Sequence, residues 1–391
     1  MCFETADILI PEKERDKFAV IACDQFTSEP DYWNAVRDFT AGSPTALDLI
    51  LPEIYLKDDN SAAIEKIQGN MEKYLARGVF SEVKDSFIFV RRVQSDGIIR
   101  EGIIGKIDLK EYSYLPGANS CAIRATEKTV LERIPPRAEI RKGAALELPH
   151  VMLLFNDAEN AVIGSLTAKT GELKKLYDFD LFGKAGHIEG YKVCGESADE
   201  VIRGLSRIRD KNNGLLFLVG DGNHSLAAAK SIYEQTGLEK DRYALVEIVN
   251  IHSPAINFEP IYRVCFGVNP AAVISDFEKN SGGAFCHEFR CVFAGGEKTV
   301  KIKSDYSLPV AALQNYLDNK AKGVKIDYIH GVESAEKIAR RDENSLGFIF
   351  KGMEKSELFG AVINDGSLPR KTFSMGHALD KRFYFEARKI V

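Results

Sequence analysis

The sequence predicts an α/β to α+β fold with mixed sheets. Two observations carry this prediction: short apolar runs of strand length alternate with amphipathic stretches of helical period, and tight turns join some β-rich segments directly. The 391 residues correspond to two or three domains at roughly 150 residues each. An apolar content of 45% is ample for a sizeable core.

The N-terminal part of the chain is expected to contain helices and strands. An apolar run at 18–23 predicts a short buried strand, and a helix capped by Ser28 should follow it. A second helix carries an apolar stripe and ends at Gly78. Residues 86–93 and 98–108 are β-rich, and the Ser-Asp-Gly sequence that joins them predicts a hairpin.

The middle of the chain alternates strands with helices. Strands are expected at 150–156, 215–220 and 243–250. Helices are expected at 197–209 and 225–235, the second of them closed by a glycine.

The C-terminal part is expected to form a hairpin at 287–303 and a strand–helix–strand unit at 324–350. We therefore expect an N-terminal α/β region at 1–110, a central region at 111–265 and a C-terminal α/β region at 266–391. Their boundaries are soft because no long linker separates them.

Composition excludes several classes of protein. The 52 basic and 57 acidic residues give a net charge of −5, so we expect no nucleic-acid partner. No apolar run approaches the roughly 20 residues of a membrane span, and the charged N-terminal segment does not resemble a signal peptide. The seven scattered cysteines favour reduced thiols in a cytoplasmic protein, and none of them forms a complete metal-ligand set.

The most informative stretch follows the strand expected at 215–220. Gly220 and Gly222 let the backbone turn sharply and approach a ligand closely, and a helix begins at once. A helix N-terminus is a natural seat for a phosphate or carboxylate group. Asp221 and His224 add a carboxylate and an imidazole, which suit proton transfer or a magnesium contact.

Other interpretations of this loop remain. It can be a plain strand-to-helix connection with Ser225 as the helix cap. A Rossmann dinucleotide loop is disfavoured because Ser225 occupies the third glycine position, and a Walker loop is excluded because no Gly-Lys-Ser or Gly-Lys-Thr follows. We favour an anion or phosphate seat of another type.

The segment Asp221-Gly-Asn-His-Ser225, followed by three alanines, resembles the D-G-H-H-R-x-x-A-A box of a prokaryotic family known as domain of unknown function ten-fifteen. Cys23-Asp24 resembles the P-Y-D segment of that family. Thr126-Glu127-Lys128-Thr129 resembles its H-E-x-T segment, and Lys371-Thr372 resembles its C-terminal K-S-T. The resemblance covers essentially the whole chain, and four motifs in the same order are fairly specific.

The same box is similar, more distantly, to the phosphate-binding motif of the ParB and sulfiredoxin superfamily, which includes a free-serine kinase. This resemblance implies a ParB/sulfiredoxin-like central region, in which Gly222, His224 and the helix start at Ser225 hold a nucleotide phosphate. Ser225 replaces the usual arginine, which removes a bidentate phosphate partner. Asn223 replaces the first histidine and keeps the capacity to hydrogen-bond.

The basic segment 120–142 offers substitutes for the missing arginine. Its clustered arginines suit phosphate neutralisation, although a solvated basic face is an equally good interpretation. Within it, Glu127 is the preferred general base because it lies in a recognisable motif. Asp24 is a further catalytic candidate, although it can also be a turn former. Cys23 paired with His224 would suit a hydrolase, but a buried structural thiol is the favoured interpretation of Cys23.

The leading prediction is a cytoplasmic, nucleotide-dependent phosphotransferase that acts on a small hydroxylated metabolite. The alternative is a non-catalytic nucleotide-sensing protein that uses the same loop. The expected partners are a small-molecule substrate and ATP or ADP with Mg²⁺. The expected catalytic residues are Glu127, Asp221, His224 and Asp24. The expected nucleotide-binding residues are Gly220, Gly222, Asn223, Ser225, Arg124, Arg133, Arg137 and Lys371.

Overall fold

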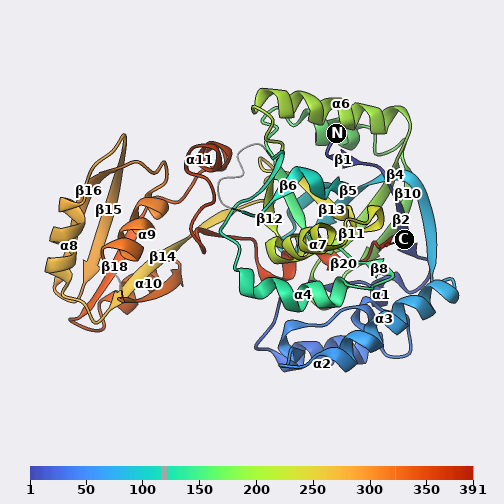
Figure 1. The fold of residues 1–391 in the computed structure, drawn as a ribbon, viewed down its shortest axis with the longest axis horizontal. Coiled ribbons are helices and arrows are strands. Elements are labelled where there is room, and N and C mark those ends of the chain that lie inside the picture. The colour runs from blue at the N-terminus through green and yellow to red at the C-terminus, as the bar shows by residue number, and fades with distance from the viewer. Residues whose placement is uncertain (116–120, 322, 391) are drawn as a thin grey trace. The chain divides into compact units, whose positions relative to one another are not determined.

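The computed structural model describes residues 1–115, 121–321 and 323–390 (Figure 1). The chain divides into two compact units. The first unit comprises Met1–Ala125, Thr129–Ile256 and His377–Val391, and the second comprises Thr126–Lys128 and Asn257–Gly376. The chain therefore leaves the first unit and returns to it at its C-terminal end. The three regions that the sequence suggests remain a prediction.

The first unit is built on one large mixed sheet. Its central strand β9 (Met152–Phe155) runs parallel to β13 (Tyr243–Asn250) and antiparallel to β12 (Phe217–Asp221). The predicted mixed α/β character is thereby confirmed. From one edge to the other, the order is β10 (Lys174–Asp180), β11 (His187–Val193), β4 (Phe80–Val93), β5 (Ile99–Asp108), β13, β9, β12, β7 (Ile123–Ala125) and β6 (Tyr112–Ser113). Two short N-terminal strands extend it, β1 (Phe3–Glu4) on β5 and β2 (Ala6–Pro11) on β4.

Strands β4 and β5 form the predicted hairpin, with Val93 opposite Ile99. The turn needs a glycine because Gly97 has φ +84°, a conformation that side-chain-bearing residues rarely adopt. Strand β4 has buried side chains on both faces. Phe87 and Phe89 pack into one core, and Ile88 and Val90 pack into the other.

Helices cover both faces of this sheet (Figure 1). Helices α5 (Ala161–Ala168) and α6 (Glu196–Lys211) pack on the face of Phe87 and Phe89. Helices α2 (Pro30–Thr40) and α3 (Ser61–Ala76) pack on the other face. None of the described helices is both long and apolar enough to span a membrane.

Three helices begin at other residues than predicted. Helix α2 is preceded by Glu29 rather than Ser28, and α6 begins at Glu196, one residue before the predicted start. Helix α7 (Asn223–Thr236) begins two residues before Ser225, because Gly222 in the left-handed region turns the chain directly from β12 into the helix. Asn223 and His224 therefore belong to the first turn of α7. The predicted C-terminal glycine, Gly237, does close this helix with φ +62°.

The second unit contains a separate antiparallel sheet. Strands β15 (Phe285–Phe293) and β16 (Gly296–Ser304) form the predicted hairpin. The predicted strand–helix–strand unit appears as β17 (Lys325–His330), α10 (Val332–Ala339) and β18 (Ser345–Phe350). The sheet is completed by β14 (Phe258–Phe266) and β19 (Phe373–Met375), and its other helices are α8 (Pro270–Lys279), α9 (Pro309–Asn319) and α11 (Glu357–Asp365).

The C-terminal segment is fixed to the first unit by strand pairing and by buried charges. Strand β20 (Phe383–Tyr384) pairs with β3 (Val20–Ile21), and β21 (Arg388–Lys389) pairs with β8 (Leu146–Glu147). Directly before β20, Arg382 forms ion pairs with Glu247 at 2.5 Å and with Glu386 at 2.6 Å. All three side chains are almost fully buried. Lys381 precedes Arg382, and Tyr384 lies between Arg382 and Glu386. The network therefore fixes the positions of both residues.

Candidate functional site

The loop between β12 and α7 is held close to the segment that precedes β9. Gly222 has φ +77°, and a Cβ at this position would lie 3.0 Å from Val151 Cα and 3.3 Å from a carbon of the His150 ring. Both the backbone conformation and this close approach therefore require glycine. The loop presents the positive end of the α7 dipole.

Asp221 links this loop to the C-terminal segment. One carboxylate oxygen accepts the Gly222 N–H at 2.8 Å, and the other lies 3.1 Å from Lys381 Nζ. The carboxylate thus fixes the glycine turn and also positions an ammonium group beside it.

The first turn of α7 also contacts residues 129–130. The Asn223 amide donates to the Thr129 hydroxyl at 2.9 Å, and the Val130 N–H donates to His224 Nε2 at 3.3 Å. Two segments with family motifs, far apart in the sequence, therefore meet within the first unit.

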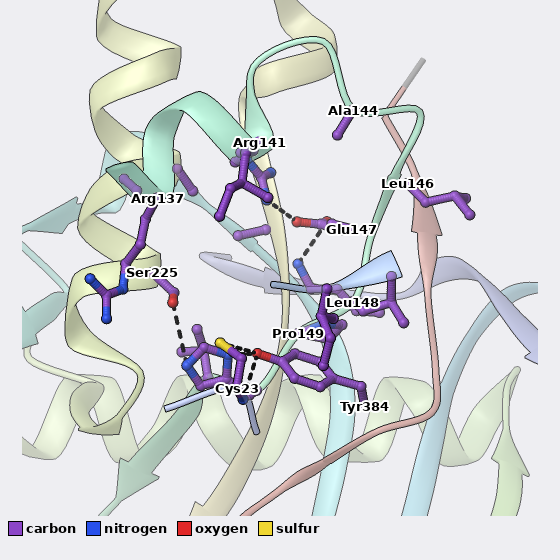
Figure 2. A pocket seen from close by; sticks show the side chains of 18 of the residues that line it. Cys23, Arg137, Arg141, Ala144, Leu146, Glu147, Leu148, Pro149, Ser225 and Tyr384 are labelled. Carbon is purple, nitrogen blue, oxygen red and sulfur yellow. Dashed lines mark hydrogen bonds and ion pairs between the residues drawn. The ribbon is translucent and has the colours of Figure 1, made fainter. Parts of the chain in front are cut away.

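A row of hydrogen-bonding side chains leads away from the loop (Figure 2). Ser225 Oγ lies 3.3 Å from His150 Nε2, and His150 Nδ1 lies 2.7 Å from the Tyr384 hydroxyl. The same hydroxyl lies 3.1 Å from Cys23 Sγ. Each of these side chains can either donate or accept a hydrogen bond. A proton shift at one end of the row can therefore be relayed to the other end.

Asp24 lies next to this row and is a charged group. Burial raises the pKa of its carboxyl, but His150, a hydrogen bond from Gln25 and Lys381 outweigh that effect, so the pKa lies below its usual value. Asp24 is therefore ionised at neutral pH.

Cys23 behaves differently from its neighbour. Burial raises the pKa of its thiol to about 11, and the charge of Asp24 contributes in the same direction. The Tyr384 hydroxyl, which also contacts His150, donates a hydrogen bond to Cys23 Sγ, and His224 Nε2 accepts the Val130 N–H. A protonated thiol is a poor nucleophile. The pairing of Cys23 with His224 that would suit a hydrolase stays a prediction.

A cavity of about 150 Å³ adjoins the row. Cys23, Ser225 and Tyr384 lie at one end of it (Figure 2), and His150, which contacts Ser225, also lines it. At the other end, Arg141 bonds Glu147 at 2.5 Å. Most of the remaining lining residues are aliphatic.

A second group of predicted residues lies within the second unit. The Glu127 carboxylate accepts the Lys371 N–H at 3.2 Å and the Thr372 N–H at 3.0 Å. The buried Arg263 donates to the carbonyl of Lys371 at 3.0 Å. Burial raises the pKa of Glu127, although these backbone bonds and the nearby arginines partly oppose that effect. Glu127 and Arg263 together hold the turn at Lys371, whose φ is +56°.

Comparison with known proteins identifies the family. The sequence model described as "Protein of unknown function (DUF1015)" matches residues 6–358. The chain belongs to this family. No curated protein matches the sequence.

Several solved structures are similar to this DUF1015 chain at low identity. "Free serine kinase in complex with AMP" is 15% identical, with a TM-score of 0.39 over 73% of this chain and 91% of that one. A conserved hypothetical protein from Pyrococcus furiosus is 13% identical, with a TM-score of 0.37 over 73% and 94%. SbnI with a C-terminal truncation, from Staphylococcus aureus, is 8% identical, with a TM-score of 0.36 over 70% and 82%.

The predicted site residues of this DUF1015 member fall into two groups. The group in the first unit includes Asp24, Arg137, Gly220, Asp221, Gly222, Asn223, His224 and Ser225. Glu127 and Lys371 belong to the second unit, where they contact each other. Arg124 also belongs to the first unit, in β7, and donates to the Cys121 carbonyl at 3.2 Å. Arg133 lies in a short 3₁₀ turn, and its side chain lies outside the described residues.

Three residues of the site were not predicted from the sequence: His150, Lys381 and Tyr384. They lie in segments without a local motif, so only their position in the fold identifies them. All three are polar residues in or beside a buried apolar segment. This pattern is too widespread in the sequence to single out these three residues.

Proposed function

We propose that this protein is a cytoplasmic, nucleotide-dependent phosphotransferase that acts on a hydroxyl group of a small metabolite. The observation that carries the proposal is the glycine turn at Gly222, where a helix N-terminus lies beside Asp221 and its partner Lys381. Asp24 lies close enough to Lys381 and His150 for their charges to lower its pKa. Phosphoryl transfer depends mainly on orientation and on positive groups around the phosphates. The helix end and Lys381 supply such groups.

Asp24 is the proposed general base. Its carboxylate is ionised at neutral pH. It accepts the proton of the acceptor hydroxyl while the acceptor oxygen bonds to the transferred phosphorus. The bond between that phosphorus and the bridging oxygen of the donor breaks, and the shortened nucleotide leaves with its electron pair. Asp221 is a positioning residue, because it holds both Gly222 and Lys381.

Glu127 receives a different role from the one that the sequence favours. Both of its carboxylate oxygens accept backbone N–H groups, which occupies the positions that a base needs for its proton. We propose that Glu127 positions the turn at Lys371. The carboxylates of Asp24 and Asp221 both face cationic partners, so they are not a ready pair of magnesium ligands. The proposed proton transfer runs from the acceptor hydroxyl to the Asp24 carboxylate.

The finer assignment of the central region to a ParB/sulfiredoxin-like fold is part of this proposal. It rests on the resemblance of the Asp221–Ser225 box and on the order in which β12, Gly222 and α7 follow one another. The phosphate seat at this box would then include the first turn of α7.

Nucleotide binding tests the proposal at the loop. The melting temperature of the native protein should rise with ATP, ADP or pyrophosphate. Lys381→Met should abolish most of this rise, whereas Lys57→Met, at an exposed position, should leave it unchanged. No response of the native protein to any of the three ligands would contradict the proposal.

Transfer separates this function from the alternative of a nucleotide sensor. A phosphotransferase should form a phosphorylated product from a panel of hydroxylated compounds, whereas a sensor should bind the nucleotide and form none.

A further inference from the structure

The cavity beside Ser225 is largely apolar. Its walls include Leu49, Met71, Leu146, Leu148 and Leu245, which come from helices, strands and loops of the first unit. Apolar walls favour a ligand that gives up little hydration on binding. The cavity volume of about 150 Å³ suits a ligand whose apolar part has roughly six to ten heavy atoms, because a dry engineered cavity of that size binds benzene.

The charged side chains that line the cavity all take part in ion pairs. Arg141 pairs with Glu147, which also bonds Arg388 at 2.5 Å. Arg137 forms an ion pair with Glu53. A cationic or zwitterionic ligand would therefore lose the hydration of its ammonium group without finding a free carboxylate in the cavity wall, because two guanidinium groups already share Glu147. Together with the apolar walls, this favours a neutral body over an amino acid.

One end of the cavity is polar and hydrogen-bonding. Ser225 Oγ and the His150 ring lie there, and Ser225 is also part of the first turn of α7 (Figure 2). A ligand hydroxyl placed against Ser225 would therefore lie beside the proposed phosphate seat, with its apolar body between Met71 and Leu245.

We propose that this cavity binds the phosphoryl acceptor, and that the acceptor is a neutral alcohol with a compact apolar body rather than a hydroxy amino acid or a polyol. This inference rests on the proposed phosphotransferase function. The acceptor loses its hydroxyl proton to Asp24, its oxygen forms the new bond to phosphorus, and the donor nucleotide leaves with the electrons of the broken bond.

Binding is measured first, without nucleotide, by ligand-observed NMR with benzyl alcohol and cyclohexanol, and with L-serine and glycerol as comparisons. The two alcohols should bind, and L-serine and glycerol should bind at least about tenfold more weakly. Ala144→Leu, which adds volume at the cavity wall, should weaken benzyl alcohol binding roughly tenfold. Ala62→Leu, at an exposed position of α3, should not change it.

A gain of binding excludes misfolding as the explanation. Met71→Ala removes a wall side chain, so this variant should bind 2-naphthylmethanol more tightly than the native protein does. If the native protein binds neither alcohol, or if neither variant changes the preference, the cavity is not the acceptor site.

Transfer of phosphate from ATP or ADP distinguishes the failure of this inference from failure of the proposed function. Transfer to glycerol or L-serine that is insensitive to Ala144→Leu would overturn the assignment of the cavity and leave the phosphotransferase function standing. Alcohol binding with no transfer to any acceptor would overturn the function, and with it the acceptor role of the cavity.

Discussion

Ser225 Oγ lies 3.3 Å from His150 Nε2, and this contact joins the first turn of α7 to the segment that enters β9. Through His150 it extends to Tyr384, at 2.7 Å, on the returning C-terminal segment. Three distant parts of the chain are thus joined at the proposed phosphate seat. The site can form only when the C-terminal segment is in place.

The glycine turn is the first element to test. Gly222→Ala should destabilise the protein by about 2–4 kcal/mol, because the new methyl group meets the Val151 backbone and the residue has positive φ. Gly42→Ala is the matched control, since Gly42 has φ +79° but nothing within 4 Å of its added Cβ. It should cost only the backbone term of about 1–2 kcal/mol. Equal losses in urea unfolding would refute a close approach at Gly222.

The buried charge network should be essential for stability. Arg382→Met leaves Glu247 and Glu386 buried without their shared partner, so we expect a loss of about 3–5 kcal/mol in the free energy of unfolding. Lys389→Met removes a more exposed ion pair with Glu82 and should cost less than about 1 kcal/mol. Chemical denaturation of the two variants gives the comparison, and a small loss for Arg382→Met would mean that the C-terminal segment is held in another way.

His187 should make stability depend on pH. Partial burial lowers its pKa, but hydrogen bonds to Asp180 and Asp178 outweigh this effect, so the pKa is raised above its usual value near 6.5. The protonated ring therefore stabilises the folded state fully below about pH 6.5, and this contribution disappears as the pH rises through the raised pKa.

The measurement is the difference in melting temperature between the native protein and His187→Gln from pH 5.5 to pH 9. The difference should be largest at the acidic end and should fall with increasing pH. A difference that grows with pH would have the wrong sign for a protonated His187.

Cysteine reactivity tests the environment of Cys23. Its thiol has a pKa of about 11, so at pH 8 it should react with iodoacetamide far more slowly than the exposed Cys194 and Cys286. Peptide mapping by mass spectrometry after timed alkylation measures the three rates. Equally fast modification of Cys23 would restore a nucleophilic role for it.

Parts of this structure could be predicted from local sequence. Strand β13 has the predicted bounds, Tyr243–Asn250, because a mostly apolar run, interrupted by Glu247, is buried on both faces of the sheet. The hairpin of β4 and β5 was predictable because its turn needs Gly97. The start of α7 was predicted too late, since a left-handed Gly222 replaced the side-chain cap expected at Ser225.

The site itself was only partly predictable. The loop at 220–225 has a local signature, because glycines and an immediate helix start occur together. Tyr384 has none, and it meets Cys23 across 361 positions of the chain. Lys381 and His150 likewise acquire a role only through the strand pairing and the Arg382 network that position the C-terminal segment.

Phosphoryl transfer by the native protein and by Asp24→Asn, followed by ³¹P NMR with ATP or ADP as donor, tests the central claim most directly. We predict that the native protein forms a phosphorylated alcohol. Asp24→Asn should slow its formation by about 10²–10⁴-fold while the nucleotide-induced rise in melting temperature is retained. Asp31→Asn, at an exposed carboxylate, should match the native rate. An absence of product with every donor and acceptor, or an Asp24→Asn variant as fast as the native protein, would contradict the account.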